Sequence, residues 1–147
     1  MPSKLLKIFL CHSSGDKPQV RALHDVLLKI GAAPWLDAEQ LLPGQDWNLE
    51  IQKALDASDV SLLCLSKKSV DKEGYVQKEI RVALDRALEM PEGRIFLIPA
   101  RLEECELPHR LKSYQWVDLF AEGGMEKLIK SLNLRAKQTG ARALSLK

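Results

Sequence analysis

The sequence predicts an α/β fold of the flavodoxin-like type, a three-layer sandwich in which a five-stranded parallel sheet of order 2-1-3-4-5 carries helices on both faces. Three observations support this prediction. Short apolar runs alternate with amphipathic stretches, a pattern typical of right-handed strand–helix–strand units. The 147 residues, 46% of them hydrophobic, suit one domain with a substantial core. The short run APWLD contains Pro34, which indicates a strand at the sheet edge.

The first strand is predicted at residues 5–11, because LLKIFLC is a nearly continuous apolar run that ends in a polar loop. Four apolar residues then recur three and four positions apart and predict a helix: Val20, Leu23, Leu27 and Ile30. We expect Asp16 to cap this helix and Gly31 to end it.

Residues 33–37 (APWLD) form the predicted second strand, and Pro34 places it at the edge because proline cannot donate to a ladder. A Pro-Gly turn indicates a long exposed loop over residues 38–46. Helical spacing of apolar residues then predicts a helix from Trp47 to Ser58.

The second half of the chain repeats this alternation. Strands are predicted at 60–65, 94–100 and 115–119, and helices at 76–87 and 125–132. The basic, turn-rich residues 135–147 are expected to be a frayed C-terminal tail or a linker, outside a domain that spans residues 1–134.

Composition and charge argue against several classes of protein. With 22 Lys and Arg against 20 Asp and Glu, the charge of +2 is too small for a typical nucleic-acid binder. No apolar run approaches the roughly 20 residues that span a bilayer, and no secretory signal precedes the first strand. Three cysteines without a C-x-x-C pair argue against disulfides and zinc. We therefore expect a cytoplasmic protein without a metal, and without nucleic-acid or membrane partners.

The predicted strand order places a ligand site beyond the carboxyl ends of strands one and three, in the loops at residues 12–16 and 66–74. Strand three ends in Leu65-Ser66-Lys67, which lacks the carboxylate of a phospho-receiver. The segment SSGDKP contains a single glycine, so it is not a phosphate-binding loop. Nucleophile-elbow motifs and metal-ligand spacing of histidines are also missing from the sequence.

Four segments in order resemble the Toll/interleukin-1 receptor (TIR) domain in its bacterial, NAD-cleaving form: KIFLCHSSGD, GAAPWLDAEQLLPGQDW, SKKSVDKEGYVQKEI and RIFLIPARLEE. They resemble the family's opening box, its second strand with a Pro-Gly loop, its active-site segment and its fourth strand. The resemblance as a whole covers roughly residues 7–132. Two positions depart from the family pattern: Cys11 stands where serine is usual, and Tyr75 where NAD-cleaving members more often carry tryptophan.

The resemblance implies an NAD+ hydrolase that cleaves the nicotinamide–ribose bond to nicotinamide and ADP-ribose or a cyclic isomer, as an effector of bacterial immune or cell-death signalling. It implies that Glu79 is catalytic, because Glu79 follows the aromatic Tyr75 by four residues and shares a helix face with it. A carboxylate there would stabilise an oxocarbenium-like ribose. Since nicotinamide leaves as a neutral pyridine, no second carboxylate is needed.

The remaining substrate contacts are expected at the loops that follow the strands: His12, Ser13, Asp37, Ser66 and Tyr75. NAD+ would then be a substrate, no cofactor is implied, and use of NADP+ stays open. Each position also has an ordinary structural interpretation: Glu79 as a solvated helix residue, Tyr75 as a half-buried aromatic at the start of a helix, and the others as loop, turn or strand-end residues.

The loop with Leu41, Leu42, Pro43 and Gly44 has two apolar side chains before its turn, which indicates a partner contact. In the family this loop packs between neighbouring domains, so the resemblance implies self-association. The same loop folded back on its own domain is an equal alternative. For the whole chain, the competing interpretations are a non-catalytic TIR–TIR signalling adaptor and a flavin- or nucleotide-binding domain without catalysis.

Overall fold

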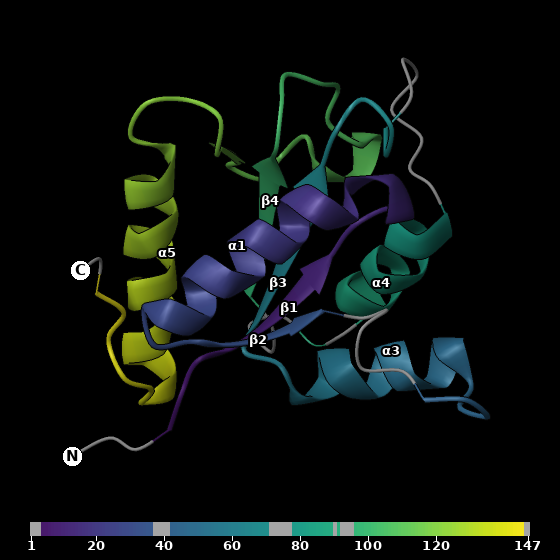
Figure 1. Cartoon of the computed structure of the whole chain (residues 1–147), viewed down its shortest axis with the longest axis horizontal. Coiled ribbons are helices and arrows are strands. Elements are labelled where there is room, and N and C mark those ends of the chain that lie inside the picture. The colour runs from purple at the N-terminus through teal and green to yellow at the C-terminus, as the bar shows by residue number, and fades with distance from the viewer. Residues whose placement is uncertain (1–3, 37–41, 71–77, 90, 92–95, 146–147) are drawn as a thin grey trace.

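A single parallel sheet organises the chain (Figure 1). The computed structural model describes residues 4–36, 42–70, 78–89, 91 and 96–145. Its five strands lie in the order β2-β1-β3-β4-β5, which confirms the predicted topology. The strands are β1 Lys7–Cys11, β2 Ala33–Leu36, β3 Val60–Leu65, β4 Phe96–Arg101 and β5 Val117–Asp118. The last strand is shorter than expected and pairs only with the end of β4.

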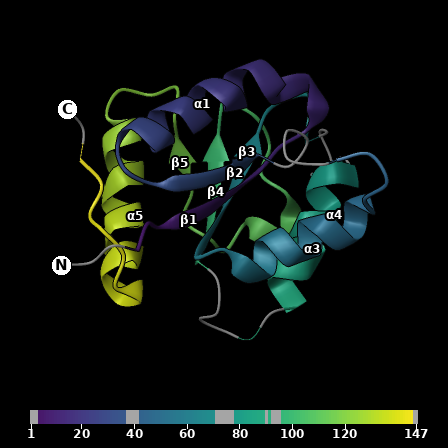
Figure 2. The ribbon, with the colours of Figure 1, turned by 60° about the horizontal axis from the view of Figure 1, so that its bottom comes forward.

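Helices cover both faces of the sheet, as predicted (Figure 2). They are α1 Lys17–Lys29, α3 Trp47–Ala57, α4 Lys78–Glu89 and α5 Gly124–Thr139, with short 3-10 turns η1 Ser14–Asp16 and η2 His109–Leu111. Helices α1 and α5 pack on one face and α3 and α4 on the other, so two separate apolar cores form. None of the described helices combines the length and apolar character needed to cross a bilayer.

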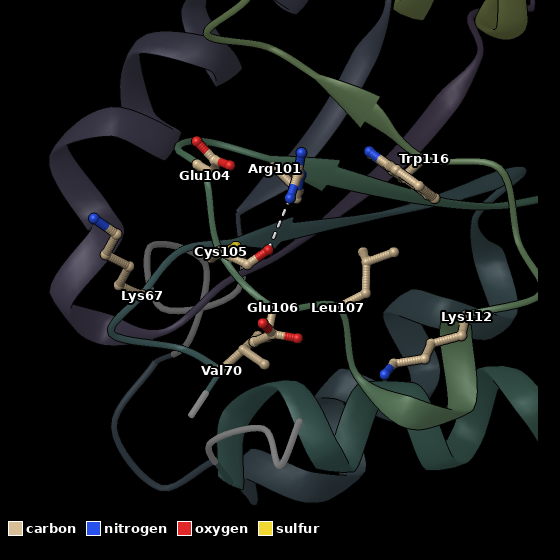
Figure 3. A pocket seen from close by; sticks show the side chains of 9 residues that line it. All are labelled: Lys67, Val70, Arg101, Glu104, Cys105, Glu106, Leu107, Lys112 and Trp116. Carbon is tan, nitrogen blue, oxygen red and sulfur yellow. Dashed lines mark hydrogen bonds between the residues drawn. The ribbon is translucent and has the colours of Figure 1, made fainter. Parts of the chain in front are cut away.

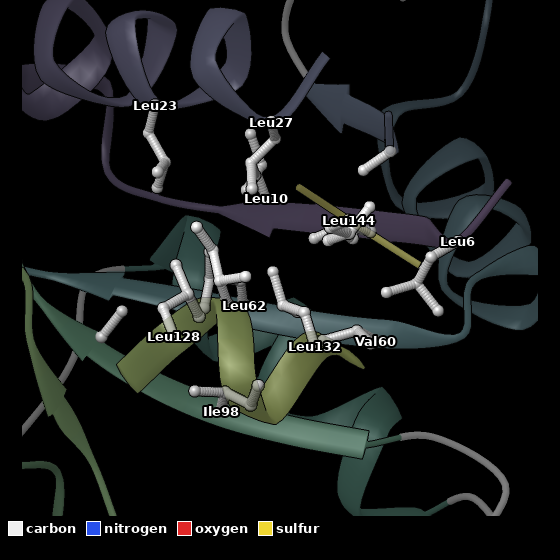
Figure 4. Packing of buried hydrophobic residues seen from close by; sticks show 14 of the residues in the cluster. Leu6, Leu10, Leu23, Leu27, Val60, Leu62, Ile98, Leu128, Leu132 and Leu144 are labelled. Carbon is white, nitrogen blue, oxygen red and sulfur yellow. The ribbon is translucent and has the colours of Figure 1, made fainter. Parts of the chain in front are cut away.

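The central strand β3 is buried along its whole length because it lies between β1 and β4. Its side chains alternate between the two cores: Leu62 packs under α1 and α5 (Figure 4), and Leu63 faces α3 and α4. Pro34 lies on the edge strand β2, opposite Ile8 of β1, as its missing N–H predicts.

The C-terminal segment differs from the expected frayed tail. Helix α5 continues to Thr139 and ends at Gly140, whose φ of 77° lets the chain reverse. Leu144 then returns to the core under α1, where it is 4% exposed. The Asn133 side-chain amide holds the Leu144 backbone: it accepts from the Leu144 N–H at 2.7 Å and donates to the Leu144 carbonyl at 3.1 Å. Residues 135–145 therefore pack as part of the domain, although their apolar residues are too sparse to reveal this in the sequence.

Candidate functional site

Three of the predicted substrate contacts meet at the carboxyl edge of the sheet. His12 and Ser13 follow β1 directly and Ser66 follows β3, and the two strands are hydrogen-bonded neighbours. All three side chains are buried, at 3%, 0% and 1% exposure respectively. The parallel sheet thus brings together residues that are more than fifty positions apart, at the strand divergence where open α/β sheets bind ligands.

Asp16 joins these two loops. Its carboxylate oxygen Oδ2 accepts hydrogen bonds from the hydroxyls of Ser13, at 3.0 Å, and Ser66, at 2.6 Å. The Asp16 N–H also donates to the Ser13 carbonyl, at 3.0 Å. Asp16 occupies the N-cap position of α1, as predicted, but its carboxylate makes no capping bond to the first turn. Sequence reasoning missed this role of Asp16, because only the folded sheet brings Ser66 from the loop after β3 to its carboxylate.

The turn after β3 is held by a second set of serine hydrogen bonds. The Ser66 N–H donates to the Ser69 hydroxyl at 2.8 Å, and this hydroxyl donates to the Ser66 carbonyl at 3.1 Å. The Lys68 N–H donates to the Ser66 hydroxyl at 3.2 Å. Because the Ser66 hydroxyl directs its proton to Asp16, it can offer a ligand only lone pairs.

Glu79, the predicted catalytic residue, is the second residue of α4. Its side chain lies outside what the structure describes, as do Asp37, Leu41 and Tyr75 entirely. The helix itself is firmly seated, because Ile80 and Leu84 are buried in the core shared with α3. The backbone of α4 therefore begins at a fixed place on this face of the sheet.

The Pro-Gly loop is exposed where the structure describes it. Leu42 is 67% exposed, and Pro43 and Gly44 are exposed beside it. Gly44 has a φ of 91°, a conformation that favours glycine. Gln45 closes the turn, since its side-chain oxygen accepts from the Leu42 N–H at 2.7 Å.

A cavity of about 840 Å³ opens at the same edge of the sheet, on the side of β3 away from β1 (Figure 3). It is lined by Lys67, Val70, Arg101, Glu104, Cys105, Glu106, Leu107, Lys112 and Trp116. None of the predicted site residues that the structure describes lines this cavity. This cavity is therefore separate from the site that the sequence predicts.

Arg101 forms one wall of this cavity and is held on several sides. It donates to both carboxylate oxygens of Asp118, at 2.6 and 2.9 Å, and to the Cys105 carbonyl at 2.8 Å. Its guanidinium lies 5.6 Å from the ring centre of Trp116. The hydrogen bond from Arg101 lowers the pKa of Asp118, and burial raises the pKa of the Cys105 thiol to about 11. The cavity thus holds a neutral thiol, which is a weak nucleophile.

Comparisons with known proteins agree with this architecture. A family model described as TIR domain matches residues 8–130. A Sinorhizobium fredii protein, y4cD, itself described as uncharacterized, is 26% identical in an alignment that covers 98% of this chain and 25% of the relative. The chain therefore spans about a quarter of that relative's length.

Solved structures show the same fold. The TIR domain of the Toll-related receptor TRR-2 from Hydra magnipapillata is similar with a TM-score of 0.70 and 17% identity, over 85% of this chain and 96% of that one. A prokaryotic SEFIR domain is similar with a TM-score of 0.65 and 20% identity, over 88% and 92%. The family match covers most of the sheet and its helices, and we conclude that this chain belongs to the TIR domain family.

Proposed function

We propose that this TIR domain is an NAD+ hydrolase whose catalytic residue is Glu79, and that it acts in the cytoplasm as an effector of bacterial immune or cell-death signalling. One observation supports the site most directly. The loop after β1 and the loop after β3 are bonded to each other through Asp16, and the β3 loop leads to α4, where Glu79 is the second residue. This is the edge where an open α/β sheet binds a nucleotide.

The chemistry needs little more than a placed carboxylate. As the bond between ribose C1′ and the nicotinamide nitrogen breaks, its electron pair stays with the leaving nicotinamide and positive charge develops on the ribose. Glu79 would stabilise that charge electrostatically. Water then adds to C1′ and releases one proton, so NAD+ and water give nicotinamide, ADP-ribose and H+. A negative charge in the first turn of a helix is itself favoured by the helix dipole.

The other predicted contacts would place the substrate. His12, Ser13 and Ser66, at the ends of β1 and β3, are proposed to contact the substrate, and Asp37 and Tyr75 are proposed to meet the ribose and the nicotinamide ring. Whether the product is linear or cyclic ADP-ribose, and whether NADP+ is also cleaved, depends on these contacts.

Release of nicotinamide from NAD+ by concentrated protein tests this proposal. Glu79→Gln preserves size and polarity and is expected to abolish turnover while leaving thermal unfolding unchanged. Glu89→Gln, at the exposed last residue of the same helix, is the matched control and is expected to keep full activity. Equal turnover in wild type and Glu79→Gln would reject Glu79 as the catalyst.

Self-association is the second candidate function, because TIR domains commonly self-associate and Leu42 is 67% exposed in the Pro-Gly loop. In a purely associating domain, Leu42→Asp would lower the sedimentation coefficient of concentrated protein, and NAD+ would remain intact. Leu134→Asp, at an exposed leucine of α5, is the control and is expected to leave assembly unchanged. If assembly completes the NAD+ site, activity will rise with protein concentration in wild type and not in Leu42→Asp.

A further inference from the structure

Asp16 is a buried carboxylate that bridges two distant parts of the chain. It is 3% exposed, and a buried carboxylate is costly unless hydrogen bonds replace its hydration. Ser13 and Ser66 supply two such bonds, the second across 50 residues of sequence. Hydroxyl bonds to an ionised oxygen are among the stronger hydrogen bonds in proteins, and the 2.6 Å length to Ser66 falls in that class.

A local role in α1 does not explain this arrangement. Asp16 stands at the N-cap position, where a side-chain hydrogen bond commonly stabilises the start of a helix. Its carboxylate nevertheless leaves the first turn of the helix without that bond and faces Ser66 instead. The side chain therefore serves the contact between the loops rather than the start of the helix.

Ser66, which is bonded to Asp16, also holds the turn that follows β3. Its carbonyl accepts from the N–H groups of Ser69 and Val70, both at 3.1 Å. The turn also packs closely on the β1 loop, because a Cβ added at Gly15 would lie 3.2 Å from the Lys68 Cδ. The path on which the chain leaves β3 is thus fixed relative to the β1 loop through Asp16.

We infer that Asp16 is a positioning residue of the site: its carboxylate locks the β1 and β3 loops together and so sets the direction in which the chain leaves the sheet toward Glu79. This inference rests on the proposed NAD+ hydrolysis. It assigns Asp16 no contact with the substrate. It predicts that activity depends on the geometry of the Asp16 oxygen more than on the stability of the domain.

Three variants of the full chain separate positioning from stability. Asp16→Ala removes the bridge. Asp16→Asn keeps one oxygen that can accept from both Ser13 and Ser66, so it should restore the bridge in part. Asp59→Ala is the matched control, because Asp59 is also buried, at 9% exposure, but precedes β3 at the opposite edge of the sheet and accepts from the Lys7 N–H at 3.0 Å.

We expect kcat for nicotinamide release to fall about 10²-fold in Asp16→Ala, with a smaller change in KM, since a shift of about 1 Å in a catalytic group has an effect of this size. Asp16→Asn should recover most of the loss. Asp59→Ala should lower the Tm and leave kcat of the folded protein unchanged. A wild-type kcat in Asp16→Ala, with Glu79→Gln inactive, would overturn the positioning role and leave the hydrolase intact.

Hydrogen–deuterium exchange tests the bridge without relying on activity. The amides of Ser69 and Val70 should exchange faster in Asp16→Ala than in wild type, and should be unchanged in Asp59→Ala. Unchanged exchange in Asp16→Ala would overturn the bridge whatever the NAD+ result. A wild type that releases no nicotinamide would overturn the proposed function, and with it the positioning role, even where the exchange result supports the bridge.

Discussion

Leu144→Ala tests whether the segment after α5 is part of the domain. The Leu144 side chain is 4% exposed in the core under α1, and a Cβ on Gly31 would lie 4.0 Å from one of its methyl groups. The substitution removes three carbon atoms, worth about 0.8 kcal/mol each in transfer free energy. Leucine-to-alanine changes in cores cost about 2–5 kcal/mol in total. We expect the free energy of unfolding to fall by about 2–3 kcal/mol.

Chemical denaturation followed by circular dichroism measures this loss. Leu134→Ala is the control, because Leu134 lies on α5 but is 52% exposed, and it should change the free energy of unfolding by less than about 0.5 kcal/mol. If Leu144→Ala costs no more than Leu134→Ala, then the C-terminal segment does not stabilise the domain and its packing against α1 is refuted.

Three further substitutions probe other contacts. Asp118→Asn removes the ion pair with Arg101, which lowers the pKa of Asp118 in the folded state. The pair therefore stabilises the fold above the ordinary pKa of an aspartate, and this stabilisation is lost as the pH falls through the folded-state pKa. When unfolding is measured below about pH 4, the free energy of unfolding should fall less steeply with decreasing pH in the variant than in wild type. Gly124→Ala would place a Cβ 2.0 Å from the Asp118 carbonyl oxygen, so calorimetry should show a free energy of unfolding about 3 kcal/mol lower than in wild type. An unchanged Tm would contradict the close approach of the Gly124 backbone to Asp118. Ser61→Ala removes a fully buried hydroxyl that has no hydrogen-bond partner among the described residues. Urea denaturation should therefore show a free energy of unfolding about 1 kcal/mol higher in the variant, and a decrease of that size would show that the hydroxyl does have a partner.

The order of the strands could be predicted because single residues constrain it. Pro34 cannot donate to a ladder, which favours the edge position that β2 occupies. The nearly continuous apolar run VSLLCL is typical of a strand covered on both faces, which agrees with the central position of β3. The meeting of the loops at His12 and Ser66 then follows from parallel pairing.

The details of the site could not be predicted, because they depend on contacts between distant residues. Asp16 has the sequence position of a helix cap, and nothing local indicates that Ser66 lies closer to its carboxylate than the helix N–H groups do. The pairing of Arg101 with Asp118 likewise depends on the register of β4 and β5. In the same way Leu144 looks isolated in sequence and finds its neighbours only after Gly140 reverses the chain.

The most direct test of the proposed hydrolase is the initial rate of nicotinamide formation from NAD+, followed by proton NMR at matched, high concentrations of folded wild type and Glu79→Gln. Loss of one group that stabilises transition-state charge typically costs about 10²–10³ in kcat. We therefore predict a measurable wild-type rate and a rate at least about 10²-fold lower in the variant. NAD+ that stays intact with wild type, or that both proteins cleave at the same rate, would contradict the assignment of Glu79 as the catalytic residue.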